Sequence, residues 1–167
     1  HIFNFLKKNN IFVDLGANIG DVSNYCADKC LAKIYAYEPH PGAYKYLLER
    51  FKKNANVKIF NYAITDSTSD NNYLYLHSED LSNGRSLEYS EASSLDINKI
   101  NVSSKNKVKI KTLLIDDLLN NFKYIDCLKI DIEGYEYKIL TSIFNNKKKI
   151  GKEICELHKK EPYSLEY

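Results

Sequence analysis

The fold of this chain is decided by the stretch IFVDLGANIG at residues 11–20. It is a short apolar run that ends at an acid and continues into a turn with two glycines, Gly16 and Gly20. A buried strand followed by a glycine turn and a helix is typical of nucleotide-binding α/β sheets, where ligands bind beyond the carboxyl ends of the strands. The dinucleotide fingerprint would need a glycine at position 18, so the turn is of another kind. A tight strand-to-helix bend without a ligand is the alternative.

Strand-like and helix-like segments alternate along the rest of the chain, as they do in a parallel α/β sheet. Apolar runs predict strands, and segments with helical periodicity predict the helices between them. The expected strands are 11–14, 33–38, 57–61, 127–131 and 153–157, and the expected helices are 21–30, one that begins near Pro41, 113–119 and 135–144. We therefore expect a doubly wound, mainly parallel α/β sheet with helices on both faces, in a single domain over residues 1–167.

The segment at about 65–107 interrupts this alternation. It is rich in Ser, Asn and Asp, has one strand-like run at 73–76, and is followed by an alternating strand at 108–111. An irregular segment of this length is more often a functional lid or insertion than a plain connector. We expect it to cover the ligand site, the alternative being a solvated loop. Its candidate ligand contacts are Asn71, Asn72, His77, Ser78, Asn83, Arg85, Ser93 and Ser94.

Composition excludes several classes of protein. Hydrophobic residues at 44% and charged residues at 28% of 167 are ordinary for a globular domain, so collagen-like and disordered chains are not expected. No apolar run approaches the roughly 18 residues of a spanning helix, and the start lacks a signal-peptide layout, so we expect no membrane partner and a cytoplasmic location. A net charge of +2 does not by itself predict a nucleic-acid partner. Because the chain has no methionine, we expect a fragment of a longer or processed protein.

The four cysteines include no C-x-x-C pair. Free thiols in a reducing cytosol are therefore expected rather than disulfides, and no metal site is expected.

The charges around the glycine turn favour a cationic ligand. Asp14 lies two residues before Gly16, where it would repel a pyrophosphate but attract an ammonium group. Glu38 ends the second strand 22 residues past Gly16, near the offset of about 20 at which an acid binds ribose hydroxyls. The two oxygens of a carboxylate suit a vicinal diol. S-adenosylmethionine has a ribose, a cationic centre and no phosphate, so it is the predicted cofactor.

Five runs in the sequence resemble the FkbM family of S-adenosylmethionine-dependent methyltransferases, over about residues 11–158. They are FVDLGANIGD, YAYEPHPGAYKYL, NYAITD, LKIDIEGYEYKIL and EICELH. The resemblance implies a Rossmann-like class I methyltransferase fold and O-methylation of a hydroxyl on a small molecule or sugar. It also implies a set of cofactor-binding residues, which are Asp14, Gly16, Ala17, Asn18, Gly20, Glu38, Pro39, Asn61, Ala63 and Asp131. Since this fold normally continues after its fifth strand, the closing hairpin is expected to be missing or replaced by elements within 65–112.

The resemblance places Asp131 and Glu133 beside the transferred methyl group. If the strand persists, alternation aims both side chains the same way, and two acids at a strand end favour a site over a core role. Glu133 is the first candidate for a general base, and Asp131 and His158 are further catalytic candidates. A magnesium ion held by Asp131, Glu133 and Glu156 is a less favoured alternative.

Two other functions stay open. An RNA or DNA methyltransferase is the runner-up enzyme, although the base-methylating motif D/N-P-P-Y/F is absent where the fourth strand ends in DIEG. A truncated, non-catalytic module that binds S-adenosylmethionine is the other alternative.

Overall fold

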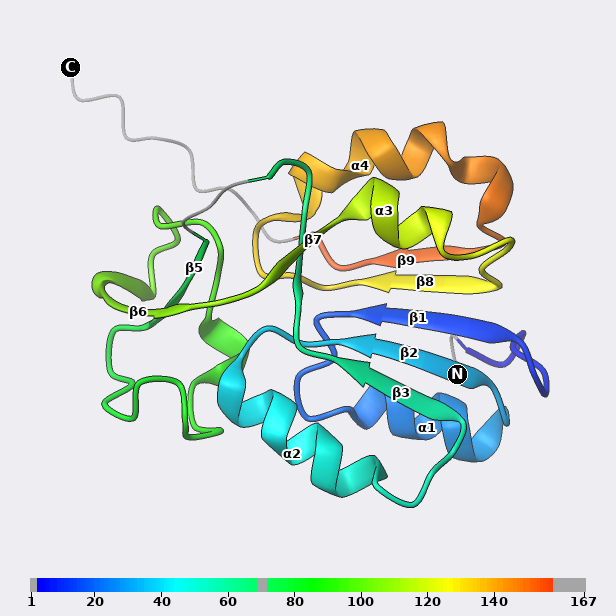
Figure 1. The fold of residues 1–167 in the computed structure, drawn as a ribbon, viewed down its shortest axis with the longest axis horizontal. Helices are drawn as coiled ribbons and strands as arrows, with labels where there is room; N and C mark the ends of the chain where they lie inside the picture. Colours follow the sequence, from blue (N-terminus) through cyan, green and yellow to red (C-terminus); the bar gives the residue numbers. More distant parts are fainter. Residues whose placement is uncertain (1–2, 69–71, 158–167) are drawn as a thin grey trace.

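Strands β1 (Ile11–Leu15) and β2 (Lys33–Tyr37) are adjacent and parallel, with Ile11 opposite Lys33 and Leu15 opposite Tyr37. They belong to a five-stranded parallel sheet in the order β3-β2-β1-β8-β9 (Figure 1). The remaining strands are β3 (Val57–Phe60), β8 (Cys127–Ile130) and β9 (Glu153–Cys155). The doubly wound, mainly parallel α/β sheet is therefore confirmed. This is a computed structural model that describes residues 3–68 and 72–157, so the expected loss of a closing hairpin stays a prediction.

Two pairs of helices cover the two faces of the sheet (Figure 1). Helices α1 (Asp21–Lys29) and α2 (Pro41–Phe51) pack on one face, and α3 (Ile115–Asn120) and α4 (Glu136–Asn145) pack on the other. Because side chains alternate along a strand, Phe12 joins the apolar cluster under α1 and α2 while Val13 joins the cluster under α3 and α4. Helix α2 begins at a proline, and the ring Nδ1 of His40 accepts a hydrogen bond from the Ala43 N–H at 3.3 Å as its N-cap.

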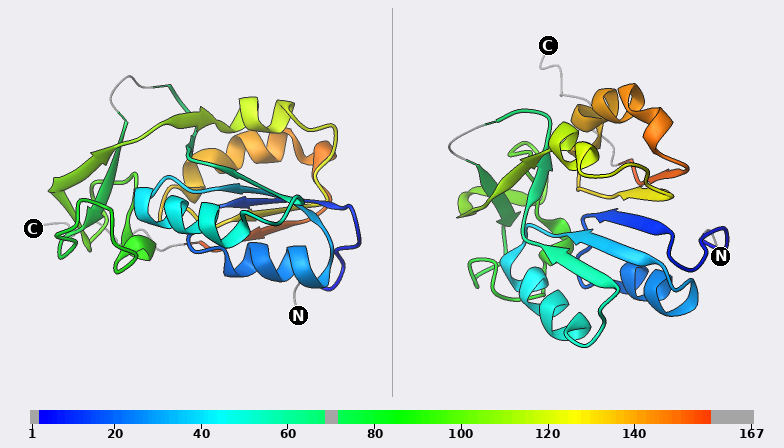
Figure 2. Two further views of the ribbon diagram at one scale, coloured as in Figure 1. Left: turned by 60° about the horizontal axis from the view of Figure 1, so that its bottom comes forward. Right: turned by 45° about the vertical axis from the view of Figure 1, so that its right-hand side comes forward.

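The segment between β3 and α3 is more regular than its sequence indicates. Strand β5 (Tyr73–His77) pairs antiparallel with β6 (Val102–Lys109), and β4 (Ala63–Thr65) pairs in parallel with β7 (Thr112–Leu114). The β5–β6 pair lies beyond the carboxyl ends of the central sheet in every view (Figures 1 and 2). The short 3₁₀ turns are η1 (Ser90–Ala92) and η2 (Lys147–Lys149).

Two sequence predictions in this region are wrong in their bounds. The strand expected at 108–111 is the end of β6, which begins six residues earlier at Val102. After Val102 the strand continues with polar residues, Ser103 to Lys107, and it is a strand because it pairs with β5, not because it has an apolar face. The helix expected at 113–119 begins at Ile115, because residues 112–114 are paired in β7.

The cysteines are free thiols, two buried and two half-buried. Among the described residues, no helix is long and apolar enough to cross a membrane.

Candidate functional site

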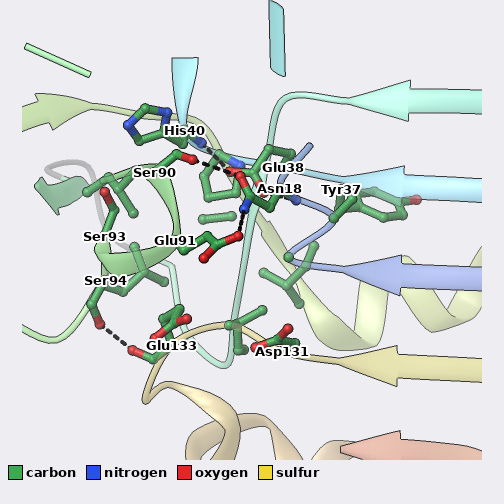
Figure 3. Close-up of a pocket in the computed structure, with 18 of the residues that line it drawn as sticks. Asn18, Tyr37, Glu38, His40, Ser90, Glu91, Ser93, Ser94, Asp131 and Glu133 are labelled. Atoms are coloured by element: carbon green, nitrogen blue, oxygen red, sulfur yellow. Dashed lines mark hydrogen bonds between the residues drawn. The ribbon is translucent and has the colours of Figure 1, made fainter. Parts of the chain in front are cut away.

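A pocket of about 350 Å³ lies at the carboxyl ends of β1, β2 and β8 (Figure 3). The glycine turn after β1, the loop after β2 and the loop after β8 form one wall, and residues 90–95 of the insertion face them. Small-molecule sites have volumes of this order, and open α/β sheets bind their ligands at this edge. Of the ten predicted cofactor residues, seven line the pocket: Gly16, Ala17, Asn18, Glu38, Pro39, Ala63 and Asp131.

Gly16 brings two of the predicted segments together. It has a φ of +76°, and a Cβ built on it would lie 1.7 Å from the carbonyl oxygen of Asp131. The N–H of Asp131 in turn donates to the carbonyl of Leu15 at 3.1 Å. The glycine turn and the loop after β8 therefore pack backbone against backbone, which no side chain at position 16 would allow.

Glu38 is the most buried acid of the pocket wall, with 5% of its surface exposed. Its Oε2 accepts a hydrogen bond from the Asn18 N–H and its Oε1 accepts one from the His40 N–H, both at 2.7 Å. Burial raises the pKa of Glu38 to about 7, although these two N–H groups act in the opposite direction. Each carboxylate oxygen has a second lone pair, so Glu38 can still accept two hydroxyl hydrogens of a ribose.

Three predicted cofactor residues lie behind the pocket rather than on its surface. Asn61 donates from Nδ2 to the carbonyl oxygens of Glu38 at 2.9 Å and Pro39 at 3.3 Å, so it supports the loop after β2. Gly20 forms the N-cap of α1, with a φ of +82°. Asp14 is fully buried, and the hydroxyl of Ser23 donates to its Oδ2 at 2.7 Å.

Lys129 takes the position at which an ammonium group was expected beside Asp14. Its Nζ lies 3.2 Å from the Oδ1 of Asp14, 3.2 Å from the Oδ2 of Asp131 and 3.2 Å from the carbonyl oxygen of Gly16. Burial alone lowers the pKa of Lys129, but the two carboxylates outweigh it and the net shift is upward. The sequence analysis missed Lys129. The register could have found it, since Lys129 is the direct neighbour of Asp14 across β1 and β8.

Asp131 and Glu133 both line the pocket, but not through strand alternation. Strand β8 ends at Ile130, and Glu133 has a left-handed φ of +56°. Glu136 shapes this turn, because its fully buried carboxylate accepts hydrogen bonds from the N–H groups of Ile132 and Gly134. The strand does not persist to these acids, so the condition for strand alternation is not met, although both side chains do reach the site.

The acids after β8 also have basic partners, which the sequence analysis did not expect. Lys99, from the insertion, forms an ion pair with Oε2 of Glu133. The hydroxyl of Ser94 donates to the carbonyl oxygen of Glu133 at 2.6 Å. These two contacts join the insertion to the loop after β8.

Residues 78–101, which we call the covering segment, close the pocket on its outer side (Figure 3). The hydroxyl of Ser90 donates to Oδ1 of Asn18 at 2.8 Å, and Nδ2 of Asn18 donates to Glu91 at 2.9 Å. The segment also rests on α2, where the Gly42 N–H donates to the Gly84 carbonyl at 2.8 Å. A Cβ at position 42 would lie within 2.9 Å of the carbonyl oxygens of Arg85 and Ser86.

Of the described polar residues expected to contact a ligand from the insertion, Ser93 and Ser94 line the pocket and the others do not. Asn72 instead donates to the hydroxyl of Thr112 at 2.8 Å, and His77 stacks on Tyr89 with ring centroids 4.5 Å apart. Asn71 and His158 lie outside the described residues. Glu156 lines the pocket, yet within residues 3–68 and 72–157 no three potential metal ligands are grouped as an ion would require.

A parallel sheet with a glycine turn after its first strand and an acid at the end of its second is typical of nucleotide-binding α/β domains, the class to which class I methyltransferases belong. Residues 14–165 match the methyltransferase FkbM domain, so the chain belongs to the FkbM family. S-adenosylmethionine is accordingly its cofactor, and the pocket fits it: Glu38 suits the ribose and the acidic lining suits a cation.

The chain is 25% identical over 155 residues to a hexuronic acid methyltransferase, AglP, of Haloferax volcanii (strain ATCC 29605). The alignment covers 91% of this chain and 57% of that protein, so the chain spans little more than half of its relative's length. A solved structure, that of P. horikoshii TYW2 in complex with MeSAdo, is 28% identical with a TM-score of 0.34. It covers 36% of this chain and 24% of the other.

Proposed function

We propose that this domain transfers the methyl group of S-adenosylmethionine to a hydroxyl of a sugar or a similar small molecule. The observation that carries the proposal is that the two facing walls of the pocket differ in their chemistry. Glu38 and the glycine turn form a wall suited to the cofactor, and serine hydroxyls of the covering segment face them. Serine side chains both donate and accept, as recognition of hydroxyl groups requires. The relative named for a hexuronic acid supports a sugar acceptor.

Three side chains have proposed roles in this reaction. Glu38 holds the two ribose hydroxyls, and Asp131, oriented by Lys129, binds the amino group of the cofactor's methionine part. The cofactor supplies an electrophilic methyl group when it is bound. Glu133 takes the proton of the acceptor hydroxyl as the oxygen–carbon bond forms and the carbon–sulfur bond breaks, which leaves S-adenosylhomocysteine and an O-methyl product. Lys99 keeps the Glu133 carboxylate oriented through its ion pair.

The test is a tritium-transfer assay with labelled S-adenosylmethionine over a panel of sugars and other small hydroxyl compounds. We expect a labelled O-methyl product from at least one sugar. Binding of S-adenosylhomocysteine by calorimetry, without transfer to any member of the panel, would contradict a sugar acceptor and leave cofactor binding intact.

Glu133→Gln separates catalysis from binding in the same assay. If Glu133 is the general base, kcat falls by about 10²–10⁴-fold while affinity for S-adenosylhomocysteine stays within about threefold. Glu153→Gln, an exposed residue at the start of β9, is the matched control and should leave both values unchanged. An unchanged kcat in Glu133→Gln would exclude the assigned role.

A further inference from the structure

The described part of the pocket lining is strongly acidic. It contains six acidic side chains and one lysine, Lys129, while two further cations at its edge, Arg50 and Lys99, are paired with Asp21 and Glu133. The six acids are Asp21, Glu38, Glu91, Asp131, Glu133 and Glu156. The cofactor brings one positive charge at its sulfonium, because its ammonium and carboxylate cancel. An excess of negative charge therefore remains after the cofactor has bound.

The basic groups at the pocket are already engaged. Lys129 lies between the carboxylates of Asp14 and Asp131. Lys99 reaches the pocket edge but is bonded to Glu133 and to the carbonyl oxygen of Ala92 at 3.3 Å. His40 carries no compensating charge, since burial lowers its pKa. Among the described residues, no cation is therefore placed to receive a carboxylate from the acceptor.

Three of the acids have no part in the proposed chemistry. Asp21 is bonded to Arg50 at 2.7 Å, and the other two, Glu91 and Glu156, lie on different elements around the pocket. Glu91 belongs to η1 in the covering segment, and its Oε1 accepts from Asn18. Glu156 directly follows β9 and is exposed. In the view of Figure 3, Glu91 lies between Asn18 of the glycine turn and Glu133 of the loop after β8. Both carboxylates are exposed, and both repel an anion that approaches the pocket, an effect that salt screens.

We infer that the acceptor is a neutral sugar or polyol and that the pocket discriminates against uronic acids. The inference rests on the proposed function, and it separates this chain from the relative that is named for a hexuronic acid. The hydroxyl of Ser93 suits a neutral acceptor, because Ser93 Oγ lines the pocket as a buried group without a hydrogen-bond partner among the described residues. The acidic lining supplies the discrimination, since an anionic acceptor would be desolvated beside like charges.

The test compares matched acceptors that differ only at C6: methyl glucoside against methyl glucuronide, and methyl galactoside against methyl galacturonide. We expect kcat/KM to be at least tenfold higher for the neutral member of a pair, equivalent to about 1.4 kcal/mol. Equal or faster methylation of the uronides would overturn the inference while supporting the proposed sugar methylation. If no sugar of either kind is methylated although S-adenosylhomocysteine binds, the proposed function fails and this inference fails with it.

A charge reversal tests the mechanism of discrimination. Glu156→Lys should raise the uronide-to-neutral ratio of kcat/KM by at least threefold. Asp28→Lys makes the same change in net charge near the end of α1, at the opposite edge of the sheet, and should leave the ratio unchanged. Raising the salt concentration from 50 to 500 mM should raise the ratio in the unaltered chain by screening the acids. A ratio that responds neither to Glu156→Lys nor to salt would overturn the electrostatic account.

Discussion

The hydroxyl of Ser90 donates to the side-chain oxygen of Asn18 at 2.8 Å, and this bond ties the covering segment to the glycine turn. The other end of the same amide donates to Glu91 at 2.9 Å. Asn18 also holds Glu38 through its backbone N–H, with its own φ at +46°. Asn18 therefore connects Glu38, the acid predicted to bind the ribose, to the outer wall of the pocket. Its partner in that wall, Ser90, lies 72 positions further along the chain.

The double variant Ser90→Ala, Glu91→Ala should weaken the closed position of the covering segment. It removes both side-chain bonds to Asn18, each worth about 0.5–1.5 kcal/mol net. Acceptor kcat/KM should fall by about tenfold, or roughly 1.4 kcal/mol of transition-state stabilisation. Affinity for S-adenosylhomocysteine, measured by calorimetry, should change by less than about threefold, because the bond from Asn18 N–H to Glu38 remains.

The control for this variant is Ser78→Ala, Glu79→Ala, which makes the same chemical changes in the same segment at exposed positions outside the pocket. It should leave turnover and affinity as they were. Full turnover in the Ser90, Glu91 variant would mean that the covering segment does not help to hold the acceptor.

Gly16 is required by the backbone contact between the glycine turn and the loop after β8. In Gly16→Ala the new Cβ would lie 1.7 Å from the carbonyl oxygen of Asp131, in addition to the strain of a left-handed alanine. We expect the free energy of unfolding to fall by about 3 kcal/mol or more in urea titrations, from left-handed strain together with overpacking.

Gly134→Ala isolates the conformational part of that effect. Gly134 also has a positive φ, +97°, but the nearest atom to its added Cβ is 4.0 Å away. It should cost only about 1–2 kcal/mol, the strain of one left-handed residue. Equal losses in the two variants would show that backbone strain, rather than the contact with Asp131, makes Gly16 necessary.

Lys129→Met should destabilise the fold and the cofactor site together. Its side chain is 13% exposed and faces Asp14, which is fully buried, so the variant leaves a buried carboxylate without its cation. Breaking such a buried pair costs about 3–5 kcal/mol. Lys52→Met breaks an ion pair whose side chains are 60% and 70% exposed, and its unfolding curve should overlay that of the unaltered chain. If Lys129→Met unfolds at the same urea concentration, the pair with Asp14 contributes no stability.

The parts of the site that lie in short motifs could be predicted from the sequence. Gly16 and Glu38 are each fixed by the end of one strand, so local pattern and spacing were enough to place them in one pocket. Lys129 could also have been predicted, because the parallel register of β1 and β8 places it directly opposite Asp14. Lys99 was not, because its ion pair with Glu133 depends on the path of the whole covering segment.

The polar half of β6 illustrates the other limit of sequence reasoning. A strand paired on an exposed two-stranded sheet needs no alternation of apolar residues, so composition assigned it to a loop. Likewise, the left-handed φ of Glu133 depends on Glu136, whose buried carboxylate receives the N–H groups of the turn. A helix-forming glutamate carries no sequence signal for that role.

Glu38 should make cofactor binding depend on pH. Burial raises its pKa from 4.5 to about 7, so the unliganded chain holds a proton on Glu38 below neutral pH. Two ribose hydroxyls donate best to the ionised carboxylate, which means that binding favours loss of this proton. Affinity for S-adenosylhomocysteine should therefore rise about tenfold from pH 6 to pH 8 and level off above. The free energy of unfolding has the opposite pH dependence. Because the carboxyl pKa is higher in the folded chain than in the unfolded chain, the folded chain loses stability as the pH rises from about 4.5 to about 7.

Glu38→Gln and Glu38→Ala separate these effects. Both remove the titrating group, so affinity should become flat between pH 6 and pH 8, and the loss of stability over pH 4.5 to 7 should disappear. Glu38→Ala also loses both charge-assisted bonds to the ribose, which should weaken binding at pH 8 by about ten- to hundredfold, or 1.5–3 kcal/mol. Calorimetry at four pH values and urea unfolding at the same values provide the data. A pH dependence of affinity that persists in Glu38→Gln would assign it to another group and remove Glu38 from the account of cofactor binding.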